Sequence, residues 1–105
     1  MTDDIGRIPS KAEFASVLDS SFLAYSSGGS EFSVRLMELN DSSSTVQETY
    51  SLEFVAPVTT APLQGIYRLV HEKLGEIEIF LVPIKKDETG LYFEAVFNRF
   101  LEPAN

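Results

Sequence analysis

The chain has 105 residues, which leaves room for one domain and not for a second. Its 16 acidic and 8 basic residues give a net charge of −8, and the basic residues are dispersed along the sequence. Proteins that bind nucleic acids or anionic membranes cluster lysine and arginine, so we expect neither kind of partner. The apolar fraction of 44% predicts a single globular domain over 1–105.

The chain contains no cysteine, which excludes disulfides, thiolate metal sites and cysteine nucleophiles. Its first residues are acidic where a secretory signal would be basic, and no apolar segment follows them. The longest nearly apolar run, 79–84, is too short to cross a bilayer. We therefore expect a cytoplasmic protein.

Residues 1–9 are polar and predict a flexible arm. Ser10, followed by Glu13 three positions later, matches a capping box at the start of a helix. Apolar residues then recur at the helical spacing i, i+3 and i+4: Phe14, Val17 and Leu18. This pattern predicts a helix over about 10–19. Such a short helix must dock on an apolar surface to be stable.

From residue 21 onward the apolar residues recur at every second position, which is typical of strands. A strand over 21–26 precedes the turn signal at 27–30. The next strand begins at Glu31, and its alternation shifts by one residue near Met37, which predicts a β-bulge. The polar segment 40–46 then predicts a loop.

The clearest half-buried strand surrounds residues 49–54, where apolar side chains alternate with polar ones. The segment 56–64 contains two prolines and predicts a connection. A strand over 65–71 follows, with Tyr67 and Leu69 on one face and Ile66 on the other. A turn at 73–75 leads into the next strand.

The strand over 75–84 has an inward series of apolar residues: Ile77, Ile79 and Leu81. From Phe80 onward both faces are apolar, which predicts that this half is covered on two sides. Pro83 cannot donate a ladder hydrogen bond and suggests a sheet edge or a strand end. A hairpin loop at 87–90 precedes the last strand, 91–100.

One helix followed by six short strands predicts a mainly β (α+β) domain. We expect an antiparallel six-stranded meander over 21–100, curled into a small barrel or roll, with the N-terminal helix plugging one end or covering one face. A helix packed on an open sheet is the alternative. The absence of helices between strands excludes parallel βαβ folds.

The sequence contains one histidine, His71, and its only nearby metal-ligand candidates are Glu72 and Glu76. Adjacent strand residues point to opposite faces, so we interpret His71 as a half-exposed residue at a strand end. The sequence also lacks a G-x-S-x-G nucleophile elbow and the glycine-rich phosphate loops. We therefore expect no metal, no cofactor and no catalytic residues.

Surfaces for binding remain. Three apolar side chains lie opposite the predicted core and would form an interface if uncovered: Phe80, Val82 and Val96. Three aromatic side chains would line a pocket if the barrel were hollow: Tyr67, Phe93 and Phe97. The first set favours a non-enzymatic binding or assembly module with a protein partner or a homo-oligomeric state. The second set favours the alternative, a small-ligand-binding β-barrel.

Three segments of the chain carry a recognisable signature: Q-G-I-Y-R-L at 64–69, L-G-E-I-E-I-F-L-V-P at 74–83, and Y-F-E-A-V-F-N at 92–98. Together with His71 and S-L-E-F at 51–54, they resemble a family of small bacterial proteins of unknown function. The resemblance implies no catalytic residues. It does imply an accessory or assembly role, because some members are associated with phage-tail-like proteins.

Overall fold

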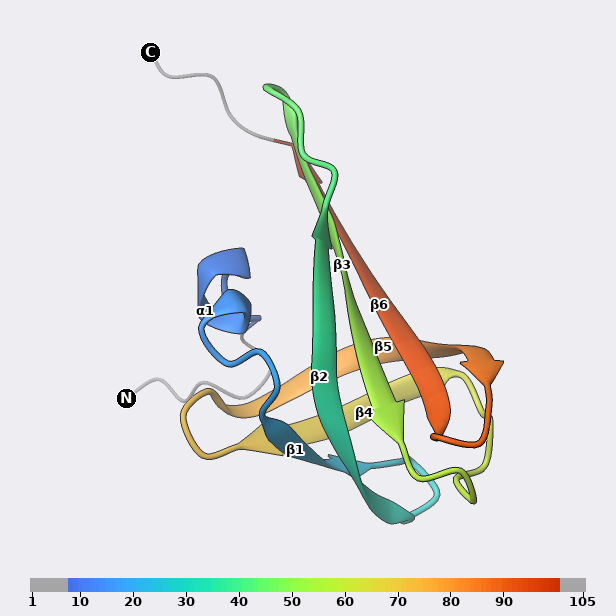
Figure 1. The fold of residues 1–105 in the computed structure, drawn as a ribbon. Helices are drawn as coiled ribbons and strands as arrows, with labels where there is room; N and C mark the ends of the chain where they lie inside the picture. The colour runs from blue at the N-terminus through green and yellow to red at the C-terminus, as the bar shows by residue number, and fades with distance from the viewer. Residues whose placement is uncertain (1–7, 101–105) are drawn as a thin grey trace.

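The computed structural model describes residues 8–100, so most of the predicted arm, residues 1–7, lies outside the described residues. The arm does not extend to Pro9, because that side chain is fully buried. The described chain contains one helix and six strands (Figure 1): α1 (Lys11–Ala15), β1 (Ser21–Tyr25), β2 (Glu31–Asp41), β3 (Gln47–Ala56), β4 (Gly65–His71), β5 (Gly75–Lys86) and β6 (Leu91–Phe100).

The strands form a closed antiparallel barrel in the order β1-β2-β3-β6-β5-β4, which confirms the predicted mainly β fold. The chain makes one meander from β1 to β3 and another from β4 to β6. Two long-range ladders, β3 with β6 and β1 with β4, join the meanders and close the ring. Strands β3 and β4 are consecutive in the sequence but are not neighbours in the ring. The connection at 57–64, which contains proline, leads the chain from β3 to β4, and β6 takes the place next to β3.

Strands β2, β3 and β6 extend well beyond the closed part of the barrel (Figure 1). The ladder of β3 with β6 runs the whole length of both strands, from Gln47–Phe100 to Ala56–Leu91. The ladder of β5 with β6 covers only one end of β6, from Val82–Glu94 to Lys86–Leu91. The outer halves of β2, β3 and β6 are consequently an extension of the barrel wall that β5 does not join.

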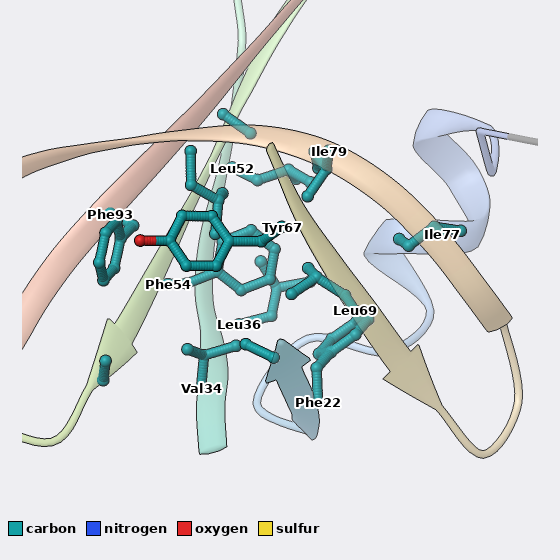
Figure 2. Packing of buried hydrophobic residues seen from close by; sticks show 14 of the residues in the cluster. Phe22, Val34, Leu36, Leu52, Phe54, Tyr67, Leu69, Ile77, Ile79 and Phe93 are labelled. Carbon is teal, nitrogen blue, oxygen red and sulfur yellow. The ribbon is translucent and has the colours of Figure 1, made fainter. Parts of the chain in front are cut away.

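The interior is filled by the alternating apolar residues of all the strands, as the period-two pattern predicts. Figure 2 shows these side chains converging from opposite walls. Phe22 and Phe54 meet edge to face, with ring centroids 5.6 Å apart. The largest side chains with almost no exposure are Phe14, Phe22, Phe54, Phe93, Leu36, Leu52, Leu69, Ile77 and Leu81. Such packing is the main stabilising contribution to the barrel.

The β-bulge predicted near Met37 is confirmed. The register of β2 against β3 shifts between Leu36 and Glu38. Leu36 pairs with Phe54 and Leu39 pairs with Leu52, so both leucines point inward although they are three residues apart. Met37 is the extra residue. Without it, the second half of β2 would turn its apolar side chains outward.

The structure corrects two expectations for β5. Pro83 is not at a strand end, because β5 continues to Lys86 and Pro83 pairs with Phe93. It does lie where one edge of β5 is unpaired, since the ladder with β4 ends at Leu81. The register of β5 against β6 shifts between Pro83 and Lys85. Nor is the strand covered on two sides from Phe80 onward, since Phe80 is 51% exposed. The helix that could have covered this face packs elsewhere.

The helix is shorter than the predicted 10–19. The capping box is present, with the Glu13 N–H donating to Ser10 Oγ at 3.1 Å and the Ser10 N–H donating to Glu13 Oε1 at 2.8 Å. The helix stops at Ala15 because Asp19 adopts a φ of 68° and donates its N–H to the carbonyl of Leu36 on β2 at 2.7 Å. Pairing with the sheet thus replaces the next helical turn.

Helix α1 packs on the inner face of the extension. Phe14 is fully buried, and its ring lies 5.9 Å from that of Phe97 on β6. Lys11 forms an ion pair with Asp41 at the end of β2, at 2.7 Å. This hydrogen-bonded ion pair lowers the pKa of Asp41 to about 2. The helix therefore covers the inner side of the extension and leaves the outer side bare.

The start of β6 packs too closely on β3 to admit a side chain at Gly90. A Cβ there would overlap the carbonyl oxygen of Ala56 and lie 2.7 Å from a methyl group of Val55. We expect Gly90→Ala to lower the free energy of unfolding by about 1–3 kcal/mol. Gly28→Ala is the control, expected within about 0.5 kcal/mol of the wild type, because its nearest contact is at 3.8 Å. Urea unfolding followed by circular dichroism measures both, and equal stabilities would contradict this packing.

Candidate functional site

His71 is buried, which corrects the expectation of a half-exposed histidine. Its side chain is 6% exposed and lies 4.5 Å, centroid to centroid, from the ring of Phe22. Its Nδ1 accepts hydrogen bonds from the backbone N–H groups of Lys73 at 3.0 Å and Leu74 at 3.3 Å. Its Nε2 lies 2.8 Å from Ser20 Oγ. Folding thus brings together a serine and a histidine that are 51 residues apart in sequence.

The hydrogen-bond network decides what this serine–histidine pair can do. Ser20 Oγ donates its hydrogen to the carbonyl of Val17 at 2.5 Å and therefore accepts from His71 Nε2–H. Activation of a serine nucleophile requires the reverse, with the imidazole accepting the hydroxyl proton. The two backbone donors at Nδ1 hold the proton on Nε2. The pair consequently ties the turn before β1 to the turn after β4 as a structural link.

Burial lowers the pKa of His71 below the ordinary value of 6.5. Glu72 acts in the opposite direction, and Lys73 adds to the lowering. Protonation would also place a donor at Nδ1, where two N–H groups already point. The neutral imidazole is therefore the form that fits the fold.

Within residues 8–100, no group of three or more histidine and carboxylate side chains is placed to hold a metal ion. No helix in that same part of the chain has the length and apolar character needed to cross a membrane.

A pocket of about 550 Å³ opens between the turn after β1 and the connection after β3. Phe32 and Tyr67 contribute aromatic rings to its lining, and the hydroxyls of Ser26, Thr59 and Thr60 contribute polar groups. Tyr67 donates its phenol hydrogen to the carbonyl of Leu63, and burial raises the pKa of the phenol. The opening is therefore an aromatic and hydroxyl-lined hollow at the barrel mouth.

The three residues predicted to line a ligand pocket are distributed over the barrel. Tyr67 lines the mouth pocket, and its ring lies 5.6 Å from that of Phe93, which is fully buried (Figure 2). Phe97 lies elsewhere, against Tyr50 at 4.9 Å and Phe14 at 5.9 Å under the helix. Phe32, which sequence reasoning missed, completes the aromatic cluster of Tyr67 and Phe93.

The three residues predicted as an interface all lie on the outer face of the barrel. Phe80 and Val96 are 51% and 57% exposed, and Val82 is half-buried. The structure adds Ile66, which pairs directly with Phe80 across β4 and β5 and is 60% exposed. The alternation along β4 had already indicated an outward Ile66, but only the ladder brings it to Phe80. We call Ile66, Phe80, Val82 and Val96 the outer patch.

The register makes the outer patch continuous across neighbouring strands. Val82 pairs with Glu94 on β6, and Val96 lies two positions further on the same face of β6. Phe80 lies two positions before Val82 on β5. Strand β5 pairs with β6 only from Val82 to Lys86, so Phe80 lies in the part of β5 that is not paired with β6. The outer patch therefore lies where the closed barrel ends and the three-stranded extension begins.

These features define a small, closed antiparallel β-barrel with a one-turn helix on the inner face of a three-stranded extension and an apolar patch on its outer wall. The chain belongs to the family described as "Domain of unknown function (DUF6916)", whose model matches residues 9–97. This match spans the barrel from the buried Pro9 to Phe97. No curated protein and no solved structure matches the chain.

His71 can be followed individually by NMR because it is the one histidine of the chain. We expect a ring with the proton on Nε2 and a pKa below 6.5. When the pH falls below 6.5, the unfolded chain binds a proton before the folded chain does, so the neutral ring's contribution to stability is lost as the pH falls through the folded pKa. Urea unfolding at several pH values should show this loss relative to the His71→Gln variant. A folded pKa above 6.5 would contradict the assignment.

Proposed function

We propose that this protein is a non-enzymatic binding or assembly module that docks a protein partner through the outer patch. The single observation that carries the proposal is the continuity of Ile66, Phe80, Val82 and Val96 on a wall that no described element covers. Exposed apolar side chains scattered singly are ordinary on protein surfaces. A contiguous group of them is typical of an interface.

The open strand edge beside the outer patch supports the same role. Beyond Glu94, β6 has no ladder with β5, although its other edge remains paired with β3 as far as Phe100. An edge of this kind offers backbone hydrogen bonds to an extended segment of a partner. Phe100, 78% exposed, adds a further apolar side chain at the end of this edge.

The setting we propose follows the family resemblance and the composition. We propose a cytoplasmic accessory or assembly role with a protein as the partner. The family resemblance suggests a phage-tail-like complex as the setting of this role. A second copy of the chain is the other partner to test. Nucleic acids and membranes are disfavoured as partners by the net charge of −8.

A specific observation also supports the alternative, a small-ligand-binding barrel. The mouth pocket has a volume within the usual range for ligand sites, about 550 Å³, and combines aromatic rings with several hydroxyls. Because the barrel interior itself is filled, a ligand would be held at the mouth and not within the barrel.

Photo-crosslinking tests the outer patch. We expect p-benzoylphenylalanine at position 80 or 96 to give a discrete adduct in the native cell, because these side chains would lie in the interface. The control position is 46, in the turn after β2, where Val46 is more exposed, at 63%, than either test position. Adding Ile66→Ser should remove the adducts from 80 and 96. No adduct at these positions, or the same adducts at position 46, would contradict the proposal.

Ligand-observed NMR with a library of neutral polar fragments tests the mouth pocket. If the pocket binds small molecules, Thr59→Trp should abolish binding, because the indole would fill a cavity that Thr59 lines. Thr89→Trp places the same side chain in the β5–β6 turn and should leave binding unchanged. Fragments that bind both variants equally, or no binding to the wild type, would end the ligand-binding alternative.

A further inference from the structure

We infer that the partner of the outer patch presents lysine or arginine side chains around an apolar contact. This inference rests on the proposed function and specifies the chemistry of the partner. It comes from a row of carboxylates that the ladders place beside the outer patch: Glu38, Glu53 and Glu94.

The row follows from the strand register. Glu38 on β2 pairs with Glu53 on β3, and Glu53 pairs with Glu94 on β6. Directly paired residues on neighbouring strands point to the same face, with Cβ atoms about 5 Å apart. The pairs that flank Glu38 and Glu53 in the ladder are Leu36 with Phe54 and Leu39 with Leu52, and these side chains point inward. The three glutamates therefore point outward. The bulge at Met37 creates this row, since it brings Glu38 opposite Glu53.

Like charges directly opposite each other destabilise a sheet. Four acidic side chains elsewhere on the described chain form an ion pair: Asp41 with Lys11, Asp19 with Arg35, Glu76 with Arg68, and Glu48 with Arg99. None of the ion pairs formed among residues 8–100 includes a member of the glutamate row. Among the described residues, the three carboxylates of the row therefore have no ion-pair partner.

The glutamate row and the outer patch form one surface. Glu94 pairs directly with Val82, and Val96 follows Glu94 on the same face of β6. A partner that covers Phe80 and Val96 must also cover or border Glu53 and Glu94. Burying these carboxylates without a positive charge would be costly, whereas a lysine or arginine beside the apolar contact would satisfy them.

The same charges argue against a second copy as the occupant. A symmetric dimer through the outer patch would bring two glutamate rows together, and each protomer carries a net charge of −8. A basic partner instead gains electrostatic attraction in addition to apolar burial. Charge complementarity thus favours a different, basic protein over self-association.

Selection from a displayed library of random 12-residue peptides, with the full chain as bait and the Phe80→Ser/Val96→Ser variant for counter-selection, tests the inference. We expect the enriched peptides to combine lysine or arginine with apolar residues. Fluorescence anisotropy of one such peptide should show binding weakened by about five- to tenfold in Glu53→Gln/Glu94→Gln. Raising NaCl from about 50 to about 500 mM should also weaken it. The control Glu88→Gln, in the β5–β6 turn, should bind like the wild type.

The outcomes separate the inference from the proposed function. The glutamine variants relieve repulsion, so they should remain folded. Neutral or acidic peptides that still require Phe80 and Val96 would overturn the basic partner and leave the proposed function standing. If no peptide distinguishes the wild type from Phe80→Ser/Val96→Ser, both fall. A wild-type dimer in light scattering that this variant abolishes would overturn the inference in favour of a second copy.

Discussion

The ladder between β3 and β6 is the interaction on which the rest of the structure depends. It joins Gln47 to Phe100 at one end and Ala56 to Leu91 at the other, and it connects the two meanders into one ring. Because the ladder is longer than the ladders beside it, β3 and β6 extend past the closed barrel. The free edge of β6, the position of α1 and the location of the outer patch all follow from that excess length.

The ladder also determines which face each residue occupies. Phe54 pairs with Phe93 and Leu52 with Ala95, so the aromatic and aliphatic residues fill the barrel. The intervening residues are directed outward in the same register. A barrel this small has no interior space left for chemistry. Its capacity for recognition therefore lies at the mouth and on the outer wall, where apolar and acidic side chains adjoin.

Ser20 and His71 illustrate why side-chain identity alone does not establish a site. The two residues are in hydrogen-bond contact, as in many hydrolases, but the backbone donors of Lys73 and Leu74 hold the imidazole in the tautomer that donates to the serine. The same atoms with the reverse proton arrangement would suggest catalysis. Here they join two turns at one end of the barrel.

The sequence by itself determined the alternation of inward and outward residues, the capping box at Ser10 and the bulge at Met37, because these depend on local spacing. The outward positions of Phe80, Val82 and Val96 followed from the same alternation. Only the tertiary structure decided that β6 pairs with β3, that Pro83 lies within a strand and that His71 is buried, because each depends on residues far apart in sequence. The glutamate row and the pairing of Ile66 with Phe80 belong to this second group. They arise from cross-strand register, which a linear pattern does not contain.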